Sequence, residues 1–339
     1  MTRAESAAPR ISLIVPCFNE SGLISSFAEG LNKTLPPLEA RFGVTFEIIF
    51  VDDGSSDGTG DVLRGMAMAS PARLIVLSRN FGKEAALTAG LDAATGDAAI
   101  LMDADFQHPP ERIAELIGKW RDGYEVVYFF KQDRAGEAAG KDLASRLFYR
   151  LVNWGGRFDI PRNAGDFRLM DRRVVEALRQ LTERQRFLKG LYGWVGFRQL
   201  GIPFEVPERP GESGSRFSTS RLVALALDGL TSFSIAPVRM ISIFGFAVAG
   251  LSMLYLVWIV TERLLFGSPF SGFASIIVLI TFFGGVQLIC LGIIGEYVGK
   301  TLLEAKQRPT YIIRERCDIC RAEGAPEAAS PEQPAGTES

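Results

Sequence analysis

The sequence predicts an α/β fold in which a Rossmann-like, mostly parallel sheet is followed by a two-helix transmembrane hairpin. Two observations support this prediction. Short β-branched runs alternate with helical stretches through the first half of the chain, which is typical of a parallel sheet with helices on both faces. Two long uncharged runs follow in the second half, and each is long enough to cross a hydrocarbon core of roughly 30 Å.

The elements of the first half follow from these short runs. The predicted strands are residues 11–15, 46–51, 73–77, 98–102 and 125–130. The predicted helices between them are residues 20–35, 59–69, 83–94 and 111–122. Ligands of such sheets bind beyond the carboxyl ends of the strands, so polar motifs directly after the strands form the candidate site.

A further helix is expected in residues 136–158, where apolar side chains recur at helical spacing with basic side chains among them. The apolar positions are Leu143, Leu147, Leu151 and Trp154. Such a helix either packs on the sheet or lies on a membrane surface, where an apolar stripe and a basic flank are both favourable. The sequence leaves both interpretations open.

The second half predicts two transmembrane helices, at about 238–261 and 273–295, within a segment 235–298. Residues 241–260 and 267–295 contain no charged side chain. Three basic residues precede the pair and five follow it, whereas only Arg263 lies between the two runs. Basic residues favour the cytosolic side, so both flanks are expected in the cytosol and the protein in the inner (plasma) membrane. The other predicted parts are a cytosolic domain (1–234), a juxtamembrane segment (299–316) and a disordered tail (317–339).

Composition narrows the possible partners and compartments. The 339 residues carry a net charge of −2, which gives no electrostatic case for nucleic-acid binding. Cys317 and Cys320 have the C-x-x-C spacing of some metal and redox sites, but no second pair accompanies them and the single histidine, His108, is far away in sequence. A reduced, cytosolic thiol pair is the simpler interpretation. The N-terminal apolar run is too short for a signal-peptide core.

Two acidic motifs follow predicted strands. The first is Asp52-Asp53-Gly54-Ser55-Ser56-Asp57-Gly58-Thr59, in which paired carboxylates could hold a base or ribose. Its Asp57 is also a plausible helix N-cap.

The second motif, Asp103-Ala104-Asp105-Phe106-Gln107-His108-Pro109-Pro110-Glu111, is chemically sharper. Carboxylates two residues apart beside a nucleotide diphosphate can hold a hard divalent cation, and Gln107 adds a neutral oxygen donor. The alternative is a capped loop with no ligand, and His108 is more simply explained as a packing residue than as a metal ligand.

These motifs, together with Val15-Pro16-Cys17-Phe18-Asn19-Glu20, resemble glycosyltransferase family 2 with a GT-A fold. The runs Ser78 to Glu84 and Gly165 to Met170, with the terminal helix hairpin, are similar to polyprenyl-phosphate glycosyltransferases. That group includes dolichyl-phosphate mannose synthases and bactoprenol glucosyltransferases. The resemblance covers roughly residues 10–312.

The resemblance implies a set of site residues. The donor pocket would be formed by Pro16, Phe18, Glu20, Asp53, Asp103, Ala104 and Asp105. Asp105 and Gln107 would bind Mg²⁺ or Mn²⁺. The acceptor phosphate would be bound by Lys131, Arg134, Lys141 and Ser145, joined by Arg209 and Arg216 from a mobile loop. That loop is one residue longer than the usual pattern, and Arg216 stands where lysine is usual. Asp166 would act as a base or as an orienter of acceptor and sugar.

The implied reaction is inverting transfer of a sugar from a nucleotide diphosphate, such as UDP-glucose, to a polyprenyl phosphate such as undecaprenyl phosphate. UDP-galacturonate, an aminosugar donor and GDP-mannose are alternatives, and an inactive membrane scaffold is a second alternative. A processive polysaccharide synthase is disfavoured because Gln185-Arg186-Phe187-Leu188 is not Gln-x-x-Arg-Trp. A dinucleotide-dependent oxidoreductase is disfavoured because no G-x-G-x-x-G follows the first strand. The expected partners are the nucleotide sugar, the lipid and the membrane, with a homo-oligomer possible through the hairpin.

Overall fold

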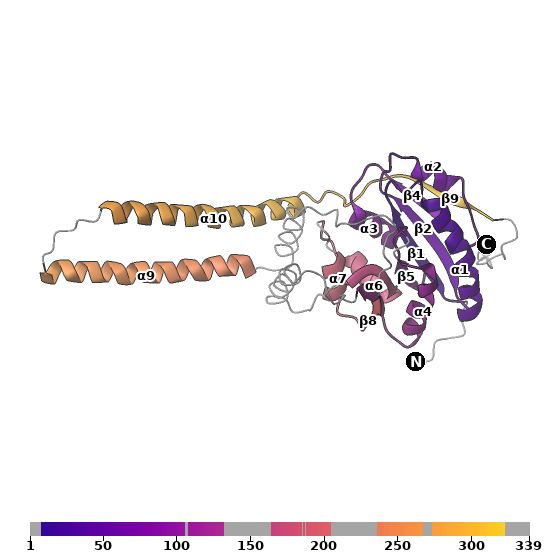
Figure 1. Ribbon diagram of the computed structural model, residues 1–339, viewed down its shortest axis with the longest axis horizontal. Helices are drawn as coiled ribbons and strands as arrows, with labels where there is room; N and C mark the ends of the chain where they lie inside the picture. The colour runs from indigo at the N-terminus through magenta and orange to yellow at the C-terminus, as the bar shows by residue number, and fades with distance from the viewer. Residues whose placement is uncertain are drawn as a thin grey trace, which may run out of the picture.

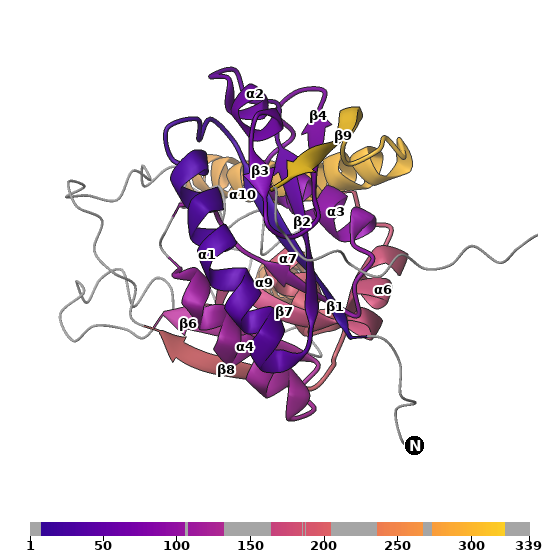
Figure 2. The ribbon, with the colours of Figure 1, turned by 90° about the vertical axis from the view of Figure 1, so that its right-hand side faces the viewer.

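The computed structural model consists of an α/β domain from which two long helices extend (Figure 1). It describes residues 8–105, 108–131, 164–184, 186, 188–204, 236–266 and 273–322. Figure 2 views the α/β domain from the side opposite the long helices and shows α1 and α4 on one side of the sheet, with α3 and α6 on the other.

The described strands form one nine-stranded sheet in the order β3-β9-β4-β2-β1-β5-β7-β6-β8. Their bounds are β1 (Arg10–Cys17), β2 (Thr45–Asp52), β3 (Ala67–Met68), β4 (Ala72–Leu77), β5 (Ala98–Leu101), β6 (Val126–Lys131), β7 (Ala164–Asp171), β8 (Gln199–Phe204) and β9 (Ile313–Arg321). The central strands β4, β2, β1 and β5 are parallel, as predicted. β7 runs antiparallel to β5 and β6, and β9 runs antiparallel to β4, so the sheet is mixed.

Each face of the sheet carries its own layer of helices. One face packs on α1 (Ile24–Phe42), α2 (Thr59–Arg64), η1 (Pro110–Arg112) and α4 (Ile113–Arg121), and the other on α3 (Lys83–Ala93), α6 (Arg172–Gln180) and α7 (Leu188–Trp194). Alternation along the strands divides the core, since Leu13 of β1 belongs to the first layer and its neighbour Ile14 to the second. α3 lies unusually close to β1, because a Cβ on Gly90 would lie 2.3 Å from Cγ2 of Ile14.

The C-terminal segment differs from the prediction. Residues 313–321 form β9, which pairs with β4 and β3, so the expectation of a disordered tail from 317 is wrong for 317–321, and part of the expected juxtamembrane segment is a strand. The segment has a period-two pattern in which residues 313, 315, 317 and 319 are less exposed than residues 314, 316 and 318. The predicted boundary followed the Ala/Pro/Glu-rich composition beyond residue 322 and missed this short alternation.

The strand also settles the geometry of the C-x-x-C pair. Residues three apart on a strand point to opposite faces, and a rise of about 3.3 Å per residue separates their Cα atoms by roughly 10 Å. A disulfide requires less than about 7 Å. Cys317 and Cys320 are accordingly free thiols, and their spacing on β9 does not suit a shared metal.

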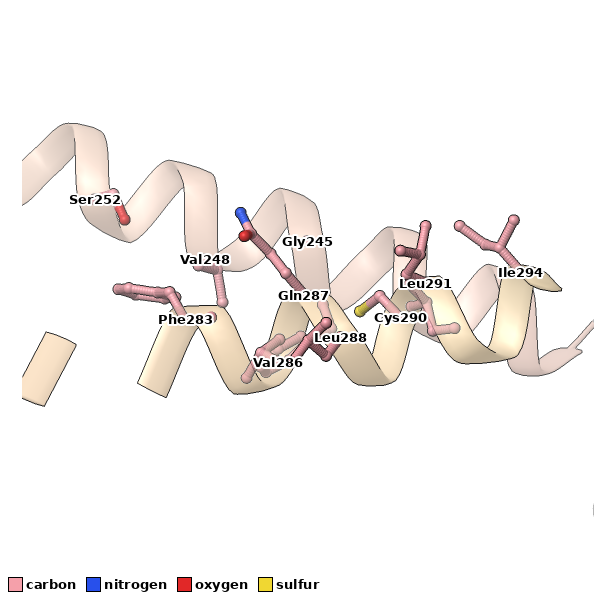
Figure 3. A pocket seen from close by; sticks show the side chains of 13 residues that line it. Gly245, Val248, Ser252, Phe283, Val286, Gln287, Leu288, Cys290, Leu291 and Ile294 are labelled. Carbon is pink, nitrogen blue, oxygen red and sulfur yellow. The ribbon is translucent and has the colours of Figure 1, made fainter. Parts of the chain in front are cut away.

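The two long helices are α9 (Ala236–Phe266) and α10 (Phe273–Ala305), which lie side by side and point away from the sheet (Figure 1). Among the described residues, one segment, Phe282–Ala305, is long and apolar enough to cross a membrane, with a mean hydropathy of 1.5. Ile243–Tyr255 of α9 is a shorter apolar segment. The two-span hairpin therefore stays a prediction. A groove of about 780 Å³ lies between the helices, lined mainly by apolar side chains with Ser252 and Gln287 among them (Figure 3).

Candidate active site

A cavity of about 300 Å³ opens at the carboxyl ends of β1, β2 and β5. Its lining contains all seven residues predicted to bind the donor, namely Pro16, Phe18, Glu20, Asp53, Asp103, Ala104 and Asp105. Parallel strands bring these segments together because their carboxyl ends meet at one edge of the sheet. The other lining residues are Cys17, Asn80, Gly82, Lys83 and Ala86, from β1 and from the turn and first helical residues after β4.

Asp53 fixes the start of α3 at the cavity. Its carboxylate accepts hydrogen bonds from the backbone N–H groups of Phe81 (2.8 Å) and Gly82 (2.9 Å). Burial raises the pKa of Asp53, although these two hydrogen bonds oppose the rise. The side chain therefore links the end of β2 to the beginning of α3 and sets the floor of the pocket.

The loop after Asp53 needs a glycine at its first position. Gly54 has φ +68°, and a Cβ there would lie 2.4 Å from the carbonyl carbon of Arg79. The same loop is tied to the end of β1, because Asn19 N–H donates to Ser55 Oγ (2.9 Å) and Ser56 N–H donates to Asn19 Oδ1 (3.0 Å). The two loops therefore form one rim of the cavity.

Asp57 has a different role from the one predicted. The N-cap of α2 is Gly58, and Asp57 precedes it. Its carboxylate accepts hydrogen bonds from Thr59 N–H (3.0 Å), Thr59 Oγ1 (2.6 Å) and Ser21 N–H (3.0 Å). Desolvation acts to raise the pKa of Asp57, but these hydrogen bonds outweigh it and lower the pKa well below its usual value. Asp57 thus joins the loop after β2 to Ser21, in the turn that precedes α1.

Lys83 joins the donor side of the cavity to Asp166. Its Nζ lies 2.7 Å from Oδ2 of Asp103 and 2.7 Å from Oδ2 of Asp166. Asp166 comes from β7, an antiparallel strand missing from the predicted strands, so the structure brings this residue to the same edge as Asp103. Lys83 was absent from the predicted site, although a lysine opening a helix after a strand at this edge was a usable signal.

The electrostatics of this group are uneven. Burial raises the pKa of Asp103, and the neighbouring carboxylates of Asp166 and Asp105 raise it further despite Lys83. Burial would also raise the pKa of Asp166, but the ammonium groups of Lys83 and Lys189 outweigh it and lower that pKa. Asp166 therefore stays ionised at neutral pH, whereas the charge of Asp103 is less well compensated.

The residues at this edge suit a hard divalent cation by their chemistry. Asp103 and Asp105 supply carboxylate oxygens, the donors that Mg²⁺ and Mn²⁺ prefer. The incomplete compensation of Asp103 also leaves negative charge that a cation would neutralise. No ready-made group of three acidic, histidine or cysteine ligands exists among the residues that the structure describes. Gln107, the second predicted ligand, lies outside them.

His108 packs rather than faces the carboxylates. Its ring stacks on Phe167 at 5.1 Å between centroids and meets the edge of Phe204 at 5.2 Å. Burial lowers the pKa of His108. The imidazole thus anchors the loop after β5 to β7 and β8, in agreement with the packing interpretation.

One predicted acceptor residue, Lys131, ends β6. The amphipathic segment 136–158 lies outside the described residues. So do the other predicted acceptor residues, namely Arg134, Lys141, Ser145, Arg209 and Arg216.

Comparison with known proteins identifies the family of the chain. The family model described as glycosyl transferase family 2 matches residues 12–179. A bactoprenol glucosyl transferase of Shigella phage SfX is 42% identical over 308 residues, which are 91% of this chain and 99% of the relative. An uncharacterized glycosyltransferase of Synechocystis sp. is 42% identical over 306 residues, covering 90% and 95% of the two chains. A solved mannosyltransferase of Pyrobaculum calidifontis, in complex with GDP-Man and Mn²⁺, aligns over 84% of this chain and 87% of its own with 18% identity and a TM-score of 0.41, too distant to inform ligands. The chain belongs to glycosyl transferase family 2.

Proposed function

We propose that this glycosyltransferase moves a hexosyl group from a nucleotide diphosphate to a polyprenyl phosphate at the cytosolic membrane face. The observation that carries the proposal is the link through Lys83 between the donor-side carboxylate Asp103 and Asp166. A transferase must hold two substrates at one point, and this ion-paired group joins the donor cavity to the strand on which the acceptor-side residue lies. The relatives named bactoprenol glucosyl transferase support a lipid-phosphate acceptor.

The donor is proposed to be a UDP-hexose, with UDP-glucose first because the phage relatives are named glucosyl transferases. UDP-galacturonate, an aminosugar donor and GDP-mannose are the alternatives. The described cavity contains carboxylates, an amide and a lysine that can bind any of these sugars by hydrogen bonds, so its lining favours none of them.

The proposed chemistry is a single displacement with inversion. An oxygen of the acceptor phosphate attacks the anomeric carbon, a new carbon–oxygen bond forms, and the bond to the nucleotide diphosphate breaks. A phosphate monoester has a second pKa near 6, so its nucleophilic oxygen is largely ionised at neutral pH and needs no strong base. Asp166 is itself ionised and paired with Lys83, which suits it to orient sugar or acceptor hydroxyl groups. A divalent cation held by Asp105 and Gln107 would supply positive charge for the leaving diphosphate.

The acceptor phosphate is proposed to bind Lys131, Arg134, Lys141 and Ser145, with Arg209 and Arg216 closing over the site. A phosphate dianion at a membrane surface requires fixed cations. Neutralising Arg134 or Lys141 should raise the apparent KM for polyprenyl phosphate tenfold or more, since a charge-assisted contact is worth about 1.5–3 kcal/mol. Calorimetry with metal and nucleotide diphosphate should give nearly unchanged donor affinity. Weakened donor binding with an unchanged acceptor KM would assign these cations to the diphosphate.

The membrane anchor is proposed to be a hairpin of α9 and α10 with both ends cytosolic. The apolar segment Phe282–Ala305 supports one span, and the excess of basic residues in the flanks supports the orientation. An impermeant thiol reagent should label a cysteine introduced at Ser268 in intact cells, but not one at Ser220 or Thr310. Labelling at either of the last two positions would exclude this topology. We also propose that copies of the protein associate through this hairpin.

The decisive experiment incubates the purified protein with polyprenyl phosphate, Mg²⁺ or Mn²⁺ and a panel of nucleotide sugars, and identifies the glycolipid by mass spectrometry. The parent protein should form a polyprenyl-phosphate hexose from one donor, and Asp105→Asn should form it at least a hundredfold more slowly. If GDP-mannose alone gave a product, the donor would be GDP-mannose and not a UDP-hexose. No product with any donor would favour the inactive scaffold.

A further inference from the structure

Glu84 lies next to Lys83 at the start of α3, but it is not among the residues that line the donor cavity. Its Oε2 accepts a hydrogen bond from the backbone N–H of Leu188 at 3.2 Å. Leu188 is the first residue of α7, a short helix far from α3 in sequence. Glu84 therefore holds the beginning of α7 against the same turn of α3 that carries Lys83.

α7 also packs on Arg168, which stands two residues after Asp166 on β7. Leu188, Leu191 and Tyr192 of α7 are buried in the same core layer as α3. The Tyr192 ring lies 3.7 Å from the guanidinium carbon of Arg168, and Arg168 is only 2% exposed. Arg168 stands two residues after Asp166 on β7, so the two side chains lie on the same face of the strand.

These contacts form a closed series that links α3, β7 and α7. Lys83 of α3 pairs with Asp166 of β7, Arg168 of β7 packs on Tyr192 of α7, and α7 returns to α3 through Leu188 and Glu84. Arg168 is fixed further because its guanidinium donates to the carbonyl of Gly165 at 2.7 Å. Besides the shared apolar core layer of α7 and α3, the polar contact given between the described residues of these two helices is the hydrogen bond from Leu188 N–H to Glu84. Loss of that bond would remove the directional contact that fixes the first turn of α7, while the apolar side chains would still hold the helix on the core.

We propose that Glu84 is a positioning residue, which sets the distance between Lys83 and Asp166 by fixing α7 to α3. This inference rests on the proposed function, because it assumes that Asp166 acts at the acceptor side of the transfer. Glu84 touches no substrate in this arrangement. Its effect should therefore appear in the turnover step, where the alignment of Asp166 matters, and not in binding of the donor at the Asp53–Asp103 side.

The test compares Glu84→Ala with Glu84→Gln in the full-length protein in detergent. The glutamine keeps an oxygen that accepts the Leu188 N–H, whereas alanine removes it. Glu84→Ala should lower kcat tenfold or more with the donor KM changed less than threefold, and Glu84→Gln should restore kcat to within threefold of the parent protein. Glu115→Gln, an exposed glutamate on α4 paired with Arg112, is the matched control and should leave kcat unchanged.

A second measurement is independent of activity. Amide hydrogen exchange of the peptide spanning 188–194 should accelerate at least tenfold in Glu84→Ala and return toward the parent rate in Glu84→Gln. Unchanged exchange and kcat in Glu84→Ala, or a glutamine variant as impaired as alanine, would overturn the positioning role. If the parent protein transfers no sugar to polyprenyl phosphate, the proposed function fails, and the exchange data still decide whether Glu84 holds α7.

Discussion

One buried carboxylate lies at the amino ends of the central parallel strands and a pair of carboxylates lies at their carboxyl ends, and their charges are compensated to different degrees. At the amino ends of β1 and β2, Glu47 accepts hydrogen bonds from Ser12 Oγ, from Thr95 N–H (2.7 Å) and from Thr95 Oγ1 (2.9 Å), and it pairs with Arg73. At the carboxyl ends, the described ion pairs give Asp103 and Asp166 a single shared ammonium group, that of Lys83.

The pKa values express this difference. Burial acts to raise the pKa of Glu47, but the hydrogen bonds from Ser12 and Thr95 and the charge of Arg73 outweigh it and lower the pKa. Burial raises the pKa of Asp103, and its acidic neighbours keep it raised. The comparison shows that the amino end satisfies its charge internally and so stabilises the fold. At the carboxyl end, Asp166 is compensated by lysines but the charge of Asp103 is not fully compensated, as expected of an edge that binds a ligand.

The largest expected effect lies at the carboxyl end. Asp105→Asn removes a charged oxygen donor from the proposed cation site, and turnover should fall at least a hundredfold, about 2.7 kcal/mol of transition-state stabilisation. Addition of a chelator to the parent protein should have a similar effect that excess Mg²⁺ or Mn²⁺ reverses. Asp122→Asn, an exposed carboxylate paired with Lys119, is the control. Full activity in the chelator would exclude a catalytic cation.

The next largest effect is a loss of stability when Glu47, at the amino ends of β1 and β2, is replaced. Glu47→Ala leaves Ser12 and Thr95 without their acceptor, so the free energy of unfolding should fall by about 2–3 kcal/mol. Because the pKa of Glu47 is lowered in the folded state, its contribution is present above its unfolded pKa and is lost as the pH falls through the folded value. Thermal denaturation of the parent and the variant checks both points, with exposed Glu29→Ala as the control. At temperatures below unfolding, kcat should be unchanged, and a large loss of kcat would contradict the division between the two ends.

Asp103→Asn tests whether Asp103, unlike Glu47, contributes to turnover more than to stability. Because the charged form of Asp103 is disfavoured by burial and by Asp166, the neutral amide should leave the melting temperature unchanged or raise it. Turnover should fall about tenfold or more, roughly 1.4 kcal/mol, because the donor side loses charge. Activity and melting temperature measured on one preparation provide the test. A variant destabilised as strongly as Glu47→Ala would mean that Asp103 is structural.

The smallest expected effect concerns pH at Glu84. Burial raises the pKa of this carboxyl to about 7, and the facing groups are Asp166, which raises it, and Lys189 and Lys83, which lower it. The raised pKa means that the contribution of Glu84 is full at acidic pH and is lost as the pH rises through about 7, opposite in sign to Glu47.

The corresponding measurement compares the melting temperatures of the parent protein and Glu84→Gln at pH 6 and pH 8.5. The parent should lose about 2–4 °C relative to the variant between these pH values. A constant difference would show that Glu84 does not titrate in this range.

The sequence by itself determined the position of the site. Each acidic motif follows a β-branched run, and parallel strands place such motifs at one edge, so Asp53, Asp103 and Asp105 could be assigned to one cavity from the sequence alone. Four strands, β3, β7, β8 and β9, were not predicted. β7 contains the alternating run Asp166-Phe167-Arg168-Leu169, a strand signal that the prediction did not use, and β9 was hidden by the composition of the tail after it.

Tertiary structure decided how these residues interact. Lys83 and Asp166 are 83 positions apart, and Arg64 and Glu315, which pair across α2 and β9, are 251 apart. No local pattern encodes such contacts, because they depend on strand order and on which helix covers which face. The same holds for Glu84, which looks like an ordinary helical glutamate in the sequence. Its hydrogen bond with Leu188 exists only because α7 folds back onto α3. The physical reason is that desolvation and charge act through space and not along the chain.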